Sequence, residues 1–122
     1  MAKKILIVDD EPGIIKMLKS RLESANYDTI TAQDGQEALD KVEKDMPDLV
    51  VLDIMIPKID GYSVFKALRT KPKYKYIPIV ILTASLEFED LRKCVSEGVE
   101  AYLRKPFKSE VLLGIIKGLL GE

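Results

Sequence analysis

Short apolar runs alternate with longer segments of helical spacing along the chain. The runs are three or four residues long and lie at 5–8, 29–32, 49–52, 79–82 and 101–103. After each run, apolar residues recur three and four positions apart, as Ile14, Leu18 and Leu22 do. Strict alternation with near-continuous apolar strands predicts an α/β fold, in which a five-stranded parallel sheet is doubly wound as (βα)5 with helices on both faces.

Three helix starts carry local signals. Asp34 followed by Glu37 resembles a capping box at the start of the second helix. Ser85 is expected to cap the fourth helix. Asp10 could cap the first helix, because Pro12 suits the first helical position.

Length and composition narrow the class of protein. The chain has 122 residues, which predicts a single domain over residues 1–122. A net charge of −1 gives no reason to expect nucleic acid or an anionic membrane as partner, and no stretch reaches the roughly 18 apolar residues of a membrane span. The single Cys94 cannot form an internal disulfide, so we expect a reducing compartment, the cytoplasm. The absence of histidine excludes histidine-based catalysis and any phosphohistidine on this chain.

Polar residues with reactive groups stand where four of the five strands end. Asp9 and Asp10 follow the first strand, Asp53 the third, Thr83 the fourth and Lys105 follows the fifth. In a parallel sheet of this kind, ligands bind outside the carboxyl ends of the strands. Each residue alone could be a turn acid, a strand-end threonine or a surface lysine, but their joint occurrence favours one site.

These groups suit phosphoryl transfer to a carboxylate. Three neighbouring carboxylates repel one another unless a cation intervenes, and an all-oxygen set suits Mg²⁺. A carboxylate nucleophile beside a metal, with an ammonium and a hydroxyl to hold phosphoryl oxygens, meets the needs of that reaction.

The sequence resembles the receiver domains of two-component response regulators over essentially its whole length. The motifs that carry this resemblance are VDDE at 8–11, VLDIMIP at 51–57, DG at 60–61, TA at 83–84 and KPF at 105–107. The resemblance implies a flavodoxin-like strand order of 2-1-3-4-5 and a phosphorylation-activated switch in signal transduction.

The resemblance also implies the role of each site residue. Asp53 would accept a phosphoryl group from a phosphohistidine of a sensor histidine kinase or a histidine phosphotransfer protein. Mg²⁺ would be held by Asp9, Asp10, Asp53 and the backbone carbonyl of Met55. Lys105 would pair with Asp53 and then with the phosphoryl group, and its bond to the following proline would be cis.

Two further residues are expected to transmit the signal. Thr83 matches the switch hydroxyl and Tyr102 the switch aromatic ring. The output would be a downstream protein target or a self-dimer, bound through the face of Tyr102 and the C-terminal helix. That helix has apolar residues over an arc wider than one buried face needs, which is typical either of a broad sheet-covering helix or of an apolar partner surface. The basic stretch from Lys66 to Lys75 is interpreted as a solvated loop rather than a nucleic-acid site.

The chain is therefore expected to be no ordinary enzyme, but a phosphoacceptor that promotes its own phosphorylation and dephosphorylation. A flavodoxin would need a phosphate-binding loop where this chain has Asp9, Asp10 and Glu11. A haloacid-dehalogenase-type phosphatase would need a second acid at the position of Met55. The intact acidic pair, Asp53, Thr83 and Lys105 argue against an unphosphorylated adaptor on the same fold. The choice between a free-standing regulator and part of a larger protein stays open.

Overall fold

The computed structural model describes residues 2–122, in which strands and helices alternate strictly. The elements are β1 (Lys4–Val8), α1 (Pro12–Ser24), β2 (Asp28–Ala32), α2 (Gly35–Asp45), β3 (Leu49–Asp53), α3 (Gly61–Thr70), β4 (Ile79–Thr83), α4 (Glu89–Ser96), β5 (Ala101–Arg104) and α5 (Ser109–Leu120). All paired strands are parallel, in the order β2-β1-β3-β4-β5. The predicted fold class and strand order are therefore confirmed.

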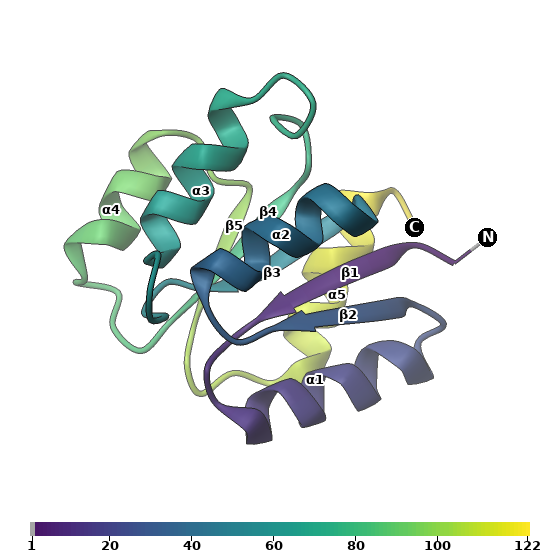
Figure 1. Ribbon diagram of the computed structural model, residues 1–122. Helices are drawn as coiled ribbons and strands as arrows, with labels where there is room; N and C mark the ends of the chain where they lie inside the picture. The colour runs from purple at the N-terminus through teal and green to yellow at the C-terminus, as the bar shows by residue number, and fades with distance from the viewer. Residues whose placement is uncertain (1) are drawn as a thin grey trace.

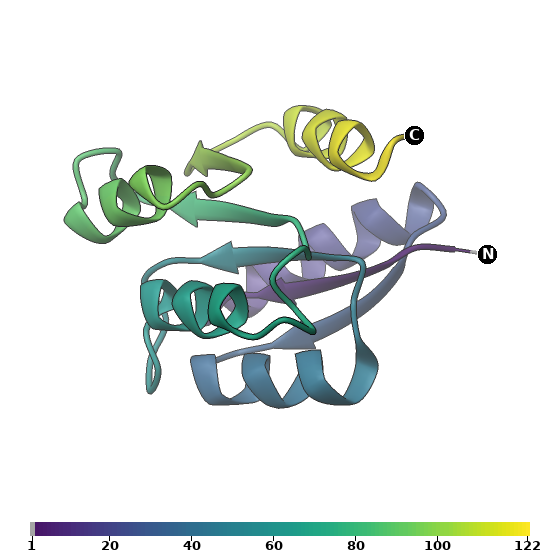
Figure 2. The same cartoon turned by 90° about the horizontal axis from the view of Figure 1, so that it is seen from above.

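The sheet lies between two layers of helices (Figures 1 and 2). Helices α2, α3 and α4 pack on one face, around a core that contains Phe65 and Leu68, while α1 and α5 pack on the other around Leu18 and Ile116. Because both faces of the inner strands are covered, every residue of β3 and β4 is buried. This explains why the first four residues of each of those strands are apolar without interruption. No helix among residues 2–122 combines the length and the apolar character that crossing a membrane requires.

The edge strand β5 differs from the inner strands. Its burial alternates along the four residues, with Tyr102 and Arg104 exposed and the two residues between and before them half-buried. A strand with a neighbour on one side only has a face that the helices leave partly uncovered. The aromatic ring of Tyr102 consequently lies on the outer surface of the sheet, next to α4.

Of the three helix caps considered, the one at Asp34 is present, while those at Asp10 and Ser85 are not. Asp34 caps α2 by accepting a hydrogen bond from the backbone N–H of Glu37 at 2.8 Å. The N-cap of α1 is Glu11 rather than Asp10, although the proline does occupy the first turn. Helix α4 begins only at Glu89, and the Ser85 side chain instead accepts from the N–H of Glu87 at 3.2 Å within the preceding loop.

The start of α3 is fixed against the end of β3. The N–H of Gly61 donates to the carbonyl of Ile54 at 3.1 Å, and a Cβ on this glycine would lie 2.5 Å from the Cα of Ile54. Asp60 caps the helix by accepting from the N–H of Ser63 at 2.8 Å. The two ends of the loop that follows β3 therefore lie together, next to Asp53, the last residue of the strand.

Candidate functional site

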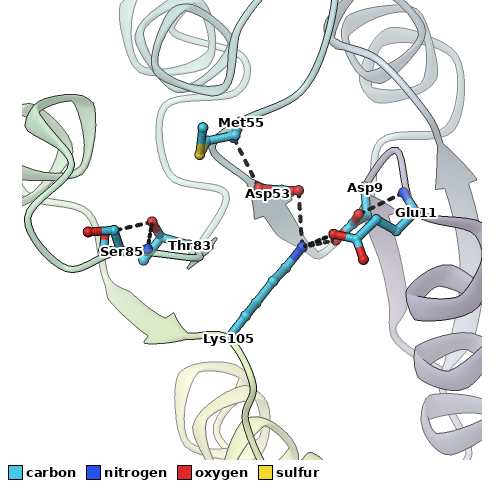
Figure 3. Close-up of polar contacts among 7 residues, drawn as sticks. All are labelled: Asp9, Glu11, Asp53, Met55, Thr83, Ser85 and Lys105. Carbon is cyan, nitrogen blue, oxygen red and sulfur yellow. Dashed lines mark hydrogen bonds and ion pairs between the residues drawn. The ribbon is translucent and has the colours of Figure 1, made fainter.

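The predicted site residues converge at one edge of the sheet. Asp53 is the last residue of β3 and Thr83 the last residue of β4, while Asp9 directly follows β1 and Lys105 directly follows β5. The parallel arrangement brings the carboxyl ends of these four strands together (Figure 3). The neighbours β1 and β3 flank the point where the chain crosses from one face of the sheet to the other, which is where this class of fold binds ligands.

Lys105 connects the acidic residues of the site. Its ammonium nitrogen lies 2.8 Å from Oδ2 of Asp9, 3.1 Å from Oδ2 of Asp53 and 3.3 Å from Oε1 of Glu11. The side chain of Asp9 is fully buried and that of Asp53 is 6% exposed, so water screens these pairs only weakly. Figure 3 shows the lysine reaching from the end of β5 across to both carboxylates.

Each carboxylate is also held by a backbone amide. The N–H of Met55 donates to Oδ1 of Asp53 at 3.0 Å, and the N–H of Glu11 donates to Oδ1 of Asp9 at 2.9 Å. One oxygen of each group therefore faces its own loop, and the other faces Lys105. This arrangement fixes the orientation of both carboxylates before any ligand arrives.

Burial and ion pairing shift the pKa values of Asp9 and Lys105. Burial raises the pKa of Asp9 above its ordinary value, although the hydrogen bond from Lys105 lowers it. Burial alone would lower the pKa of Lys105, but its bonds to Asp9 and Asp53 raise it above the ordinary value. Folded Asp9 thus holds a proton more readily than unfolded Asp9, so the stability that it contributes at low pH is lost as the pH rises through its folded pKa. At neutral pH, a second cation beside Asp9 would relieve the free-energy cost of burying its charged form.

The donor set fits a divalent cation that prefers oxygen. One carboxylate oxygen from each of Asp9, Asp10, Glu11 and Asp53 lies within 4.8 Å of the others. Such a cluster of hard, negatively charged ligands matches Mg²⁺, which also retains several waters. The side chain of Glu11 was not predicted as a member; it is 60% exposed, and in the sequence it resembles an ordinary surface residue at a helix start.

Among the described residues, no hydrogen bond joins the Thr83 hydroxyl to Asp53. Its hydroxyl donates to the carbonyl of Ser85 at 2.8 Å and accepts from the N–H of the same residue at 3.2 Å. The hydroxyl is therefore engaged in the loop between β4 and α4, away from the carboxylates in Figure 3. The sequence predicts that Thr83 lies at this edge, as it does, but gives no indication of which way its hydroxyl points.

Met55, Tyr102 and the bond after Lys105 were also predicted to have a part in function. The side chain of Met55 is 54% exposed and points away from Lys105 (Figure 3). Tyr102 is 44% exposed and borders a groove of about 270 Å³ that Leu86 and Val95 also line. The bond between Lys105 and Pro106 is cis, as predicted.

Comparisons with known proteins agree on one family. The family model described as "Response regulator receiver domain" matches residues 5–117. The chain is 45% identical over 120 residues to the alkaline phosphatase synthesis transcriptional regulatory protein PhoP of Bacillus subtilis, covering 98% of this chain and 49% of PhoP. The chain thus spans about half the length of this curated relative.

Two solved structures have the same fold over nearly the whole chain. Chemotaxis response regulator CheY4 of Vibrio cholerae superimposes with a TM-score of 0.90 at 34% identity, covering 98% of this chain and 99% of CheY4. The receiver domain of sensor histidine kinase PA1611 from Pseudomonas aeruginosa gives a TM-score of 0.90 at 30% identity, with complete coverage of both chains. In that structure a magnesium ion is coordinated in the active site cleft.

Replacing Lys105 with alanine tests the charge balance of the cluster. We expect Lys105→Ala to lower the free energy of unfolding in metal-free buffer by about 3 kcal/mol, because it leaves buried carboxylates without their cation. Added Mg²⁺ should then raise the melting temperature more in the variant than in the wild type. Thermal and urea unfolding with and without Mg²⁺ measure both effects.

Lys108→Ala serves as the matched control, because Lys108 is exposed and lies three residues away. This variant should stay within about 0.5 kcal/mol of the wild type. An equal or smaller Mg²⁺ response in Lys105→Ala than in the wild type would show that Lys105 and Mg²⁺ do not neutralise the same carboxylates.

Proposed function

The chain belongs to the response regulator receiver family, and from that premise we propose that Asp53 is its phosphorylation site. A receiver domain of two-component response regulators is a phosphorylation-activated signalling switch. The observation that carries the assignment is the ion pair between Lys105 and Asp53, at 3.1 Å, on a carboxylate whose side chain is 6% exposed. It presents an oriented nucleophile with a cation already beside it.

The chemistry at Asp53 is a transfer between two covalent bonds. An oxygen of the carboxylate attacks phosphorus, a new P–O bond forms, and the P–N bond to the donor's imidazole breaks with its electron pair leaving on nitrogen. Lys105 stabilises the negative charge that spreads over the phosphoryl oxygens. Asp9, Asp10, Asp53 and the backbone carbonyl of Met55 would hold Mg²⁺, which supplies further positive charge at the same oxygens.

Thr83 and Tyr102 are proposed to convert this reaction into a change of surface. The phosphoryl group offers a charged acceptor that competes with the Ser85 carbonyl for the Thr83 hydroxyl. When the hydroxyl turns toward the phosphoryl group, the loop between β4 and α4 loses the 2.8 Å bond that now holds it. Tyr102, which borders the groove beside α4, then has room to change its rotamer.

Receiver domains of response regulators act between histidine kinases and effectors. For this chain we propose a sensor histidine kinase or a histidine phosphotransfer protein as donor. The output surface would be the face of Tyr102 and α5, where Val111 is also exposed, and it would bind a downstream protein or a second copy. The buried free thiol of Cys94 is compatible with the cytoplasm, where we place the reaction.

We also propose that the chain promotes loss of its own phosphoryl group, and slowly. Hydrolysis needs a water in line with phosphorus, opposite the Asp53 oxygen. The two residues expected beside that path are Met55 and Ser85. The thioether of Met55 offers only a weak hydrogen-bond acceptor and Ser85 is short, so neither orients a water well.

Substitution of the acceptor tests the assignment directly. Incubation with acetyl phosphate and Mg²⁺ should give the wild type a hydroxylamine-sensitive acyl phosphate. In Asp53→Asn we expect no labelling, because an amide is not the required nucleophile. Intact-mass spectrometry and peptide mapping measure the label and its position.

Asp60→Asn is the control, because Asp60 lies on the same loop and asparagine can still cap α3. It should be labelled like the wild type. Full labelling of Asp53→Asn would assign the acceptor to another residue, and an unlabelled wild type would favour the adaptor that keeps only the fold.

The lifetime of the acyl phosphate depends on water access in this account. Combining Met55→Asn with Ser85→Glu should shorten the phosphoryl half-life about tenfold, because polar side chains at both positions can orient the attacking water. Decay of the label after removal of the donor is the measurement, and Mg²⁺ affinity should change little. A half-life equal to that of the wild type would remove these positions from the path of the water.

A further inference from the structure

The loop between β3 and α3, residues 54–60, rests on the first residues of helix α2. The N–H of Gly35 donates to the carbonyl of Pro57 at 3.2 Å. The ammonium of Lys58 lies 3.4 Å from Oδ2 of Asp34, whose other oxygen caps α2. A helix that is distant in sequence thus holds the middle of the loop that follows Asp53.

Gly35 permits this contact through its lack of a side chain. A Cβ at this position would lie 1.8 Å from the carbonyl oxygen of Ile59 and 2.6 Å from its carbonyl carbon. Both are backbone atoms, so the clash could be relieved only by moving the loop away from α2. The position therefore requires a glycine because there is no space for a side chain, and the path of the loop depends on this residue.

Lys58 lies at the point of contact in an unusual backbone conformation. Its φ is 66°, in the left-handed region that residues with a side chain seldom adopt. Such a conformation persists only where surrounding contacts hold it. The ion pair to Asp34 and the hydrogen bond to the adjacent Pro57 carbonyl are the contacts in place to do so.

The two ends of the loop are fixed separately. The N–H of Ile54 donates to the carbonyl of Leu82 in the next strand at 3.0 Å, and Gly61 closes the far end. Met55 lies between these two ends of the loop. Its N–H donates a hydrogen bond to Asp53, and its carbonyl is the expected cation ligand. Since α2 supports the middle of the loop, its contacts influence where the peptide groups of Met55 lie.

We propose that Asp34 and Gly35 are positioning residues for the phosphorylation site, which hold loop 54–60 so that the Met55 carbonyl is set for a divalent cation. This inference rests on the proposed function, because it takes the Met55 carbonyl as a Mg²⁺ ligand. It gives α2 a part in cation binding, although neither residue is itself a proposed ligand.

The experiment uses a substitution for which positioning and charge predict opposite results. Lys58→Met removes a cation near an acidic site, so charge alone predicts tighter Mg²⁺ binding. Release of the loop predicts weaker binding, by about threefold for an exposed ion pair. Calorimetric titration of Mg²⁺ into the intact protein measures the affinity, and we expect the weaker binding.

Gly35→Ala should weaken Mg²⁺ binding further, by about tenfold, as substitutions behind a metal ligand commonly do. Gly114→Ala is the matched control, because a Cβ there meets no atom within 4 Å and the residue lies in α5. This control should bind Mg²⁺ like the wild type. If Gly35→Ala fails to fold, Lys58→Met decides alone.

Amide hydrogen exchange without Mg²⁺ provides a readout that does not depend on the cation. The amides of Met55 and Gly61 should exchange faster in Lys58→Met than in the wild type. Unchanged exchange, or Mg²⁺ binding as tight as in the wild type, would overturn the inference. A wild type that binds no Mg²⁺ would instead overturn the cation assignment of the proposed function, and the exchange rates would still decide whether α2 holds the loop.

Discussion

Carboxylates gathered at the buried end of a sheet repel one another, and only a cation among them makes the arrangement tolerable. In this protein the cation is the ammonium of Lys105, within 2.8 Å of Asp9 and 3.1 Å of Asp53. The same ion pair, with the backbone N–H of Met55, fixes the orientation of the Asp53 carboxylate, the proposed nucleophile. Burial raises the pKa of Asp9 and so disfavours its charged form, which a second cation beside it would stabilise. Stability and chemistry therefore depend on one interaction.

The fold determines the geometry of the ion pairs that Lys105 makes. Parallel strands place residues that are far apart in sequence at one edge. The loop that follows β3 is held by α2, whereas the loop that follows β4 is held by hydrogen bonds among its own residues. The loop after β4 is the less constrained of the two. The two hydrogen bonds between the Thr83 hydroxyl and Ser85 are both neutral, and a charged phosphoryl group can outcompete them. That difference suits one loop to hold the cation and the other to move.

Much of this could be predicted from the sequence because apolar runs reveal the inner strands, and strand ends in a parallel sheet converge. Those two facts placed Asp9, Asp53, Thr83 and Lys105 together, whereas the strand order came from the resemblance. Features that depend on tertiary contact could not be predicted. The Ser85 cap was wrong because α4 starts four residues later. The approach of Gly35 to a loop more than twenty residues away leaves no local pattern.

We propose that Lys105 and Thr83 exchange their present partners for the phosphoryl group on Asp53. A crystal structure of the protein with Mg²⁺ and beryllofluoride, a phosphoryl analogue, tests it most directly. We expect the Lys105 ammonium to leave Asp9 and bond a fluorine on Asp53, and the Thr83 hydroxyl to leave the Ser85 carbonyl for another fluorine. A structure with the analogue bound to Asp53 and both present contacts intact would show that this exchange does not occur.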